Sequence, residues 1–374
     1  MKKKGHTLLV INWQDIRHPL AGGAEVHGHE IFRCLATRGY TVVQLSCAFP
    51  GAPGRELKDG ILIQRAGNRN LFNFFVPQQS RELCREFRVD LVIENINKIP
   101  FFTPLYIRRP ILVLVHHLFG RAVYHAVSPH YGTYVLAAEQ LIPLIYRHTP
   151  FAAVSESTRS ELKRIGIRGS LDLMPNGNDL PDWRELNSPD IPPVIGYFGR
   201  VERYKHIDHL LEALPQIRAA VPGTMVRIIG DGFHRRRLEQ RVRWMRLEKA
   251  VTFTGRVAEV DKWKEISRLY IGVYSSAKEG WGLSVMELAA CGVPVVASDV
   301  PGLRETVRHK ETGLLYSFGD IEALTHQVVS LLESPDLRNR MGKQARTWAS
   351  SRSWDAAADQ AEDLIERTLF NAKN

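Results

Sequence analysis

The sequence predicts an α/β protein made of two halves of similar construction. Short apolar runs rich in β-branched residues, such as 111–115, alternate with amphipathic stretches throughout residues 1–180. The same alternation begins again after a proline-rich segment at residues 181–193. Nearly continuous apolar strands that alternate with helices are typical of parallel sheets covered on both faces. A chain of 374 residues is long enough for two such domains, at roughly 100–200 residues each.

The elements of the first half follow from local patterns. Residues 6–12 form the first apolar run and predict a strand, and residues 24–38 predict a helix. Gly39 ends that helix, because glycine accepts the left-handed conformation that follows many helices. Further strands are predicted at residues 41–45, 89–94, 111–115 and 151–154.

The proline cluster predicts a linker, since proline has no amide hydrogen and restricts the residue before it. It contains Pro181, Pro189, Pro192 and Pro193. We therefore expect domains at 1–187 and 188–353. The second half predicts strands at 194–198, 225–229, 251–253, 271–274, 293–297 and 314–316, and helices at 207–220 and 233–247. A last helix, within about 354–374, could pack on either domain.

The composition excludes several classes of protein. Hydrophobic residues make up 44% and charged residues 24%, so the chain has ample apolar surface to fold. No apolar run approaches the roughly 20 residues of a membrane span. The apolar stretch after Lys4 stops at Asn12, which is too short for a signal peptide. The four cysteines have neither metal-binding spacing nor a paired framework, which favours reduced thiols in the cytoplasm.

The formal net charge is +10 and is unevenly spread. Residues 1–187 hold 23 Lys and Arg against 16 Asp and Glu, whereas residues 188–374 hold 27 against 24. A basic surplus indicates an anionic partner: nucleic acid, a membrane surface or a phosphorylated substrate. Composition alone does not choose among these.

The most informative motif is the segment from Glu279 to Glu287. A strand ends near Ser275, a loop containing Gly280 and Gly282 follows, and a helix opens near Ser284. The unpaired amides and the dipole of a helix N-terminus form a natural phosphate site. Glu287 lies about one turn inside this helix, where a carboxylate can accept hydrogen bonds from a ribose diol.

A second motif follows the strand at 194–198. Arg200 and Lys205 lie beyond its carboxyl end, which is where open α/β sheets bind ligands. Two fixed cations can hold a diphosphate and stabilise it as it leaves. We therefore expect no metal requirement, and the sequence has no Asp-x-Asp pair to hold a divalent ion.

A third motif, Gly22-Gly23, lies between the first strand and the first helix. Paired glycines let the backbone approach a ligand closely, although a plain turn explains them as well. The Gly-x-Gly-x-x-Gly fingerprint is absent here, which argues against a standard dinucleotide site.

Together these motifs resemble the retaining glycosyltransferases of family 4. The resemblance extends over nearly the whole chain. It includes Gly22–Glu25, Val154–Thr158, Pro175–Gly177, Gly199-Arg200 with Lys205, Ile229–Gly232, Phe253–Val257 and the Glu-x7-Glu of Glu279 and Glu287. It implies the GT-B fold, in which two Rossmann-like domains face each other across a cleft, the first binding the acceptor and the second the donor.

The resemblance also implies roles for residues at matching positions. Arg200 and Lys205 bind the donor diphosphate, and Glu279 positions the donor sugar. The remaining expected donor contacts are Gly22, Gly23, Arg256, Val257, Gly282, Leu283, Ser284, Val285 and Glu287. A histidine after the strand at 111–115 contacts the transferred sugar. His116, at the first position after the strand, fits this role best, and His117 is the alternative.

The expected activity is transfer of a sugar from a nucleotide diphosphate sugar, with a UDP- or GDP-sugar as donor co-substrate and no permanently bound cofactor. A glycan, a lipid-linked compound or a small molecule is the acceptor. A sugar epimerase or phosphorylase of the same fold, and a non-enzymatic anion- or nucleic-acid-binding protein, are the alternatives. The arginines from Arg235 to Arg246 fit a solvated helix face better than a binding patch.

The resemblance implies that the first half of the chain, which carries most of the basic surplus, binds the acceptor. We expect it to attract an acidic or lipid-linked acceptor at the cytoplasmic face of a membrane, by contact with anionic headgroups. Nucleic acid becomes the least favoured partner, because no nucleic-acid reader motif is present.

Overall fold

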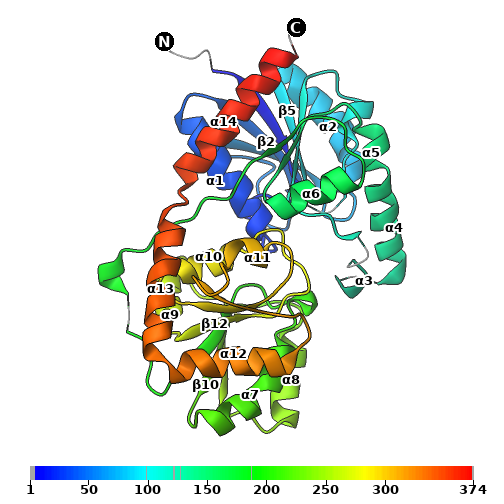
Figure 1. Cartoon of the computed structure of the whole chain (residues 1–374). Coiled ribbons are helices and arrows are strands. Elements are labelled where there is room, and N and C mark those ends of the chain that lie inside the picture. The colour runs from blue at the N-terminus through cyan, green and yellow to red at the C-terminus, as the bar shows by residue number, and fades with distance from the viewer. Residues whose placement is uncertain (1–4, 98, 121–122, 127, 187, 373–374) are drawn as a thin grey trace. The chain divides into compact units, whose positions relative to one another are not determined.

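The computed structural model describes residues 5–97, 99–120, 123–126, 128–186 and 188–372 (Figure 1). The chain divides into two compact units. Unit 1 comprises Met1–Gly177 and Trp354–Asn374, and unit 2 comprises Asn178–Ser353. The chain thus passes from one unit to the other at 177/178 and at 353/354, whereas the sequence prediction puts the first boundary at 187/188.

The described part of unit 1 contains a sheet of eight strands in the order β3-β4-β2-β1-β5-β6-β7-β8. All neighbours are parallel except β3 and β4, which are antiparallel. The strands are β1 (Thr7–Ile11), β2 (Thr41–Ala48), β3 (Arg55–Lys58), β4 (Ile61–Asn68), β5 (Leu91–Ile96), β6 (Ile111–Val115), β7 (Phe151–Ala153) and β8 (Leu171–Leu173).

Helices accompany this sheet, and the chain's last helix is one of them. They are α1 (Gly23–Thr37), α2 (Phe72–Glu86), α3 (Val123–Ala126), α4 (Pro129–Gln140), α5 (Ile142–Ile145), α6 (Glu156–Arg164) and α14 (Trp354–Asn371). Figure 1 shows α14 running alongside α1. Arg38, directly after α1, pairs with Asp359 at 2.8 Å and with Glu362 at 3.0 Å. These contacts fix the end of the chain to unit 1.

Unit 2 contains a parallel sheet of six strands in the order β11-β10-β9-β12-β13-β14 across its described residues. They are β9 (Val194–Phe198), β10 (Met225–Ile229), β11 (Val251–Gly255), β12 (Ile271–Tyr274), β13 (Val295–Ser298) and β14 (Gly313–Tyr316). The helices are α7 (Asp208–Ala220), α8 (Arg235–Trp244), α9 (Glu259–Ser267), α10 (Leu283–Ala290), α11 (Leu303–Thr306), α12 (Ile321–Glu333) and α13 (Pro335–Ser350). Helix α7 packs beside α12, and α10 beside α13.

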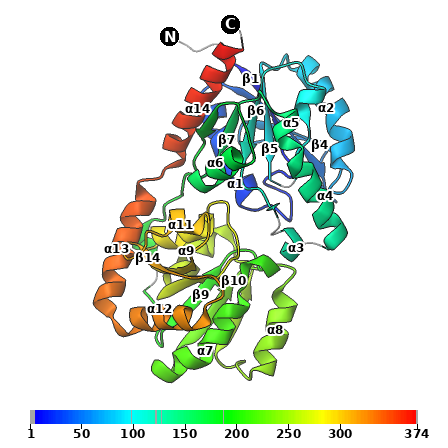
Figure 2. The same ribbon diagram turned by 45° about the vertical axis from the view of Figure 1, so that its right-hand side comes forward.

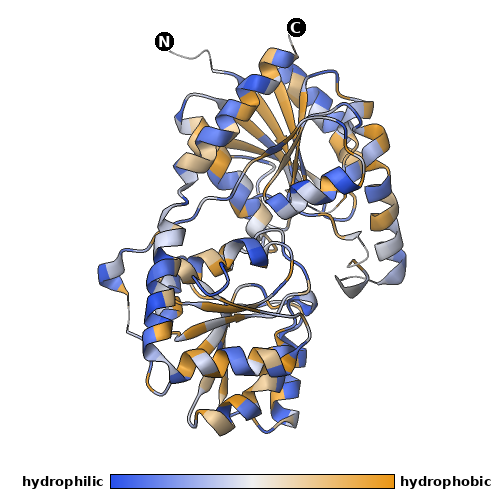
Figure 3. Ribbon diagram, in the orientation of Figure 1, coloured by the Kyte–Doolittle hydropathy of each residue, from blue (hydrophilic) through white to orange (hydrophobic). Residues whose placement is uncertain are grey.

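The core of each unit is centred on its sheet. Figure 3 shows hydrophobic residues concentrated on the strands, with polar residues on the outer sides of the helices. Strands β5 and β9 are buried almost throughout, because helices cover both faces of a parallel sheet. The predicted α/β class is confirmed, with a parallel sheet in unit 2 and a sheet in unit 1 that is parallel except at β3. No helix among the described residues is both long enough and apolar enough to span a membrane.

The sequence analysis did not predict β3, β4 or α2. Helix α2 contains Pro77, which has no amide hydrogen to donate and so weakens the helical signal of the segment. Strand β4 alternates between buried and half-buried residues, whereas the central strands form continuous apolar runs. The alternation reflects its place near the sheet edge, between β2 and the short antiparallel β3.

Candidate functional site

In unit 2, the segments that follow β9 and β10 approach the start of α10. A Cβ on Gly199 would lie 3.6 Å from Ser284 Oγ, and one on Gly230 would lie 1.9 Å from the Gly199 oxygen. Both glycines have positive φ, at +135° and +136°. Only glycine fits such a conformation at such close range. These two residues therefore hold three segments together at the carboxyl edge of the sheet.

Lys205 and Glu279 form a nearly buried ion pair at this edge. Their side chains are only 10% and 11% exposed, and Ser276 Oγ donates a hydrogen bond to the same Glu279 oxygen at 2.7 Å. Burial by itself would lower the pKa of Lys205, but the Glu279 carboxylate outweighs it and raises the pKa. Lys205 is therefore a fixed cation at neutral pH.

The backbone around the pair is fixed as well. Ala277 N donates to the Tyr204 oxygen at 3.0 Å, which joins the segment after β12 to the turn that carries Lys205. Ser298 Oγ, at the end of β13, donates to the Ser276 oxygen at 2.6 Å. Arg200 has an exposed side chain, and its carbonyl accepts a hydrogen bond from Tyr197 at 2.8 Å.

Helix α10 begins after Gly282, whose φ is +114°. The first amides of a helix have no acceptor inside it, which applies here to those of Leu283 and Ser284. The amide of Val285, the third expected donor, donates to the Gly282 oxygen at 2.9 Å. The Ser284 hydroxyl interacts with Tyr274, whose own hydroxyl donates to the Phe198 oxygen at 2.8 Å. The start of α10 is therefore anchored to β9 and β12.

Glu287 lies one turn into α10 and contacts Lys262 at 3.0 Å. The Lys262 side chain is 8% exposed and lies 4.4 Å from the centre of the Trp263 ring. Burial raises the pKa of Glu287, and the Lys262 ammonium opposes the rise. The sequence analysis missed Lys262, which comes from α9 and meets Glu287 only through the tertiary fold.

Arg256 and Val257 directly follow β11 and so belong to the same edge of the sheet. The Arg256 side chain is exposed and that of Val257 is half-buried. Of the residues predicted in unit 2, the structure thus brings Lys205 and Glu279 into direct contact and holds the Gly199 backbone near Ser284.

Unit 1 has its own polar group at the carboxyl edge of its sheet. The Gly22 amide donates to Glu25 at 2.7 Å, which caps the start of α1. Glu25 is buried and accepts a hydrogen bond from Asn97 Nδ2 at 2.9 Å, while the same nitrogen donates to Asn12 Oδ1 at 3.1 Å. Gly23 is the first residue of α1. The loops after β1 and β5 are thereby joined to the start of α1.

A buried histidine pair lies in the same unit. The rings of His27 and His116 are 5.1 Å apart, and His27 Nε2 lies 3.2 Å from the Pro175 oxygen. Burial lowers the pKa of His27 to about 4 and that of His116 well below its usual value. Both rings are therefore neutral at pH 7. His117 is half-buried, with its ring 4.6 Å from that of Phe119.

Several buried polar atoms near these strand ends have no protein partner among the described residues. They are His27 Nδ1, His116 Nε2, Asn97 Oδ1, Asn176 Nδ2 and both amide atoms of Asn95. Leaving such atoms without a hydrogen bond is costly, so a water or a ligand is expected to satisfy them. Neither His27 nor Asn95 and Asn97 were predicted as site residues, although Asn97 directly follows an apolar strand, as the predicted His116 does.

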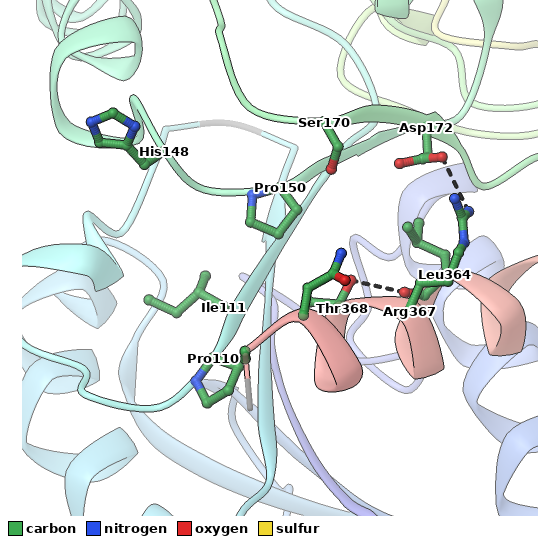
Figure 4. Close-up of a pocket in the computed structure, with 11 residues that line it drawn as sticks. Pro110, Ile111, His148, Pro150, Ser170, Asp172, Leu364, Arg367 and Thr368 are labelled. Carbon is green, nitrogen blue, oxygen red and sulfur yellow. Dashed lines mark hydrogen bonds and ion pairs between the residues drawn. The ribbon is translucent and has the colours of Figure 1, made fainter. Parts of the chain in front are cut away.

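A separate cavity of about 400 Å³ lies at the opposite edge of the same sheet. Pro110 and Pro150, which precede β6 and β7, line it together with residues of α14 (Figure 4). Arg367 of α14 pairs there with Asp172 of β8 at 3.1 Å. None of the predicted site residues lines this cavity.

Two family models match the chain in succession. Residues 21–181 match "Glycosyltransferase Family 4", and residues 182–348 match "Glycosyl transferases group 1". Glycogen synthase of Mycobacterium tuberculosis is 25% identical over 371 residues, covering 91% of this chain and 89% of the relative. A GDP-mannose-dependent phosphatidylinositol monomannoside mannosyltransferase of the same species is 29% identical over 231 residues, covering 57% and 60%.

Solved structures share the fold over nearly the whole chain. Sucrose-phosphate synthase from Thermosynechococcus elongatus superimposes with a TM-score of 0.84 at 24% identity, covering 98% of this chain and all of the other. Anabaena Alr3699/HepE in complex with UDP-glucose gives 0.77 at 19% identity, covering 96% and 99%. WaaG, a glycosyltransferase of lipopolysaccharide biosynthesis, gives 0.73 at 16% identity, with the same coverage.

Proposed function

Because the chain belongs to glycosyltransferase family 4 and has the GT-B fold, we propose that it transfers a sugar from a nucleotide diphosphate sugar with retention of anomeric configuration. The observation that carries the proposal is the Lys205–Glu279 pair on segments adjoining the start of α10. A buried cation beside helix amides suits a diphosphate that gains charge as it leaves. The names of the relatives support a GDP-sugar or a UDP-sugar as donor.

We assign the donor contacts to unit 2. Arg200, Lys205 and the first amides of α10 bind the diphosphate. Glu287 accepts hydrogen bonds from the ribose, and Glu279 orients the donor sugar. The backbone at 256–257 borders the base. The basic groups supply the stabilisation that a metal would otherwise give, so we propose that transfer needs no divalent ion.

We propose that unit 1 contributes Gly22, Gly23 and one histidine to the reaction. The neutral ring of His116 suits a hydrogen bond to a sugar hydroxyl, and His117 remains the alternative. The acceptor hydroxyl attacks from the face that the diphosphate leaves, and the departing phosphate takes its proton. Charge on the phosphate grows mainly in the transition state, so Arg200 and Lys205 affect turnover more than binding.

Replacement of the two cations tests this proposal. Arg200→Ala and Lys205→Met should each lower kcat by more than about 100-fold, the scale of losing one charge-stabilising group. Arg203→Ala is the matched control, because Arg203 is exposed on the same turn. The measurement is product formation from a panel of UDP- and GDP-sugars, with the anomeric configuration assigned by NMR. Wild-type turnover in both variants, or products of epimerisation or phosphorolysis, would contradict the assignment.

We further propose a lipid-linked acceptor and peripheral contact of unit 1 with the cytoplasmic face of an anionic membrane. Helices α2, α4 and α5 lie along one side of unit 1 (Figure 2) and expose large apolar side chains. These are Phe74, Phe75, Tyr131, Tyr134 and Leu144. Arginines accompany them, such as Arg85 on α2. Exposed aromatic residues beside basic ones favour an anionic bilayer surface.

Co-sedimentation with vesicles tests the membrane contact. Binding should rise with the fraction of anionic lipid and fall in Phe74→Ser/Leu144→Ser. Phe233→Ser is the control, since Phe233 is equally exposed but belongs to unit 2. Binding that changes neither with the fraction of anionic lipid nor in the Phe74→Ser/Leu144→Ser variant would contradict the proposed membrane contact.

A further inference from the structure

The segment directly after Lys205 contains a group of side chains that the transfer reaction does not use. His206, Asp208 and His209 each offer one ligand atom, and these three atoms all lie within 4.8 Å of one another. All three residues are half-buried. They lie where the chain leaves β9 and enters α7.

Two features of the histidines make the group unusual. His209 Nδ1 is buried and has no hydrogen-bond partner among the described residues. His206 has a φ of +46°, in the left-handed region that is unfavourable for a residue with a side chain. That backbone conformation orients the ring, whose centre lies 5.0 Å from that of His209.

The surroundings resemble those of a metal site. The Phe318 ring lies 5.1 Å from that of His206 and 5.4 Å from that of His209, which provides an apolar wall. An apolar wall limits access of water and strengthens bonds between an ion and its ligands. The Asp208 carboxylate supplies negative charge, and all three residues remain partly exposed to solvent.

We propose that His206, Asp208 and His209 bind a divalent transition-metal ion of the zinc class. Two imidazoles and one carboxylate, with a position left for water, are a ligand set that zinc accepts, whereas magnesium prefers oxygen ligands alone. Ligand atoms around a tetrahedral zinc ion lie about 3.3 Å apart, for bonds of about 2.0–2.1 Å. The upper limit of 4.8 Å on their separations exceeds that spacing by about 1.5 Å, a difference that side-chain rotation can close.

The ion would act as a clamp on the turn that carries Lys205. Ser275 Oγ donates a hydrogen bond to the His206 oxygen at 2.6 Å, and Ser275 adjoins Ser276, which contacts Glu279. Fixing His206 to α7 would therefore stabilise both segments that hold the Lys205–Glu279 pair. The binding itself does not depend on the proposed transfer activity, so either proposal can fail without the other.

Titration of untagged, chelator-treated full-length protein with Co²⁺ and Zn²⁺ tests the site. Wild-type protein should bind one equivalent, with the visible absorption of a Co²⁺ ion held by imidazole nitrogens, and Zn²⁺ should displace it. Zn²⁺ should also raise the melting temperature, because a ligand that binds only the folded state stabilises it. Mg²⁺ should do neither.

Variants of the three ligands make the test specific. His209→Gln, Asp208→Asn and His206→Gly should each weaken Co²⁺ binding more than about 10-fold, since losing even an outer partner of a ligand costs about 10–100-fold. His206→Gly suits the positive φ, and Asp208→Asn is nearly isosteric, so both should stay folded. His326→Gln, an exposed histidine on α12, should bind as wild type does. A wild-type protein without stoichiometric binding, or a His206→Gly/His209→Gln protein that keeps it, would overturn the proposal.

Discussion

At the scale of single residues, the buried histidine pair of unit 1 links stability to pH. The pKa of His27 is about 4 in the folded chain and about 6.5 when unfolded, because burial penalises the imidazolium. Between these values the unfolded chain binds more protons, so stability falls as pH decreases. A pKa difference of this size corresponds to about 3 kcal/mol of folding stability. The chain has this stability in full above pH 6.5 and has lost most of it near pH 4.

His27→Gln should therefore flatten the pH dependence of stability between pH 6.5 and 4.5. Urea unfolding monitored at several pH values in this range measures the slope. His326→Gln, which makes the same substitution at an exposed position of α12, is the matched control. An unaltered slope in His27→Gln would mean that the buried ring does not titrate as described.

Lys262 offers a second test at this scale. Its ammonium lies 3.0 Å from Glu287, which we assign to the ribose of the donor. Lys262→Met keeps the packing on Trp263 but removes the charge, so Glu287 gains a proton more readily and loses its orientation. Nucleoside diphosphate affinity should drop about 10-fold or more, the value of one charged hydrogen bond.

Calorimetry with UDP and GDP measures that effect. Glu287→Ala should weaken binding of the preferred nucleotide at least as much, and Lys264→Met, an exposed neighbour on α9, should not. Equal affinities in wild type, Lys262→Met and Glu287→Ala would remove the ribose assignment.

At the scale of elements, the packing of β9 against β10 at their carboxyl ends requires glycine. A Cβ on Gly230 would lie 1.9 Å from a backbone oxygen that belongs to Gly199. Gly230→Ala should therefore destabilise unit 2 by about 3 kcal/mol or more, through overpacking and a strained φ. It should also abolish nucleotide binding, because it would displace Gly199, whose backbone approaches Ser284.

Gly319→Ala separates the two causes. Gly319 also has positive φ, +86°, but nothing lies within 4 Å of an added Cβ. It should cost about 1–2 kcal/mol from the backbone alone. Thermal unfolding of the two variants side by side gives the comparison, and equal losses would show that contact with Gly199 does not matter.

The elements whose limits the sequence predicts correctly are strands that lie inside their sheets and are largely buried. Strands β6, β9, β10 and β12 have the predicted limits, because runs of four or five residues rich in β-branched or aromatic side chains are too short for a helix and favour a strand. Strand β4 and helix α2 lie in the segment of unit 1 where polar residues and Pro77 dilute the pattern. The fold there depends on pairing with β2, which no local window contains.

The candidate site also contains residues that the local sequence marks and residues that only the tertiary fold identifies. Arg200, Lys205, Glu279 and Glu287 stand out because glycines and strand ends mark them in the chain. Their partners do not stand out: Lys262 and Ser276 are ordinary residues until the fold brings them to Glu287 and Glu279, and the same holds for His27 beside His116. Spacing in the sequence therefore identifies candidate site residues, whereas the side chains that hold them in place are identified only by the fold.

At the scale of the whole molecule, the chain enters unit 2 once and leaves it once. The amide of Asn178 donates to the Arg352 oxygen at 2.8 Å, so the entering and leaving segments are paired. Gly177 and Trp354 adjoin each other within unit 1, where a Cβ on Gly177 would lie 2.5 Å from the Trp354 Cα. Unit 2 is thus a continuous insertion whose two ends are close together.

This arrangement predicts that each unit folds by itself if its own segments are kept. Residues 178–353 contain a complete hydrophobic core and should unfold cooperatively when expressed alone. Residues 1–177 joined by a short glycine linker to 354–374 should do the same. Residues 1–177 alone should not, because α14 buries Trp354, Leu364, Ile365 and Leu369 against this unit.

The loss of α14 is large on the scale of domain stability. Each of these four side chains contributes roughly 1.5–3 kcal/mol by its burial, and the sum is comparable to the whole stability of a typical domain, about 5–15 kcal/mol. Circular dichroism melting of the three fragments measures the difference. A cooperative transition in residues 1–177 at the temperature of the linked fragment would show that α14 only covers unit 1. Its absence would show that the last helix completes the core begun by the first 177 residues.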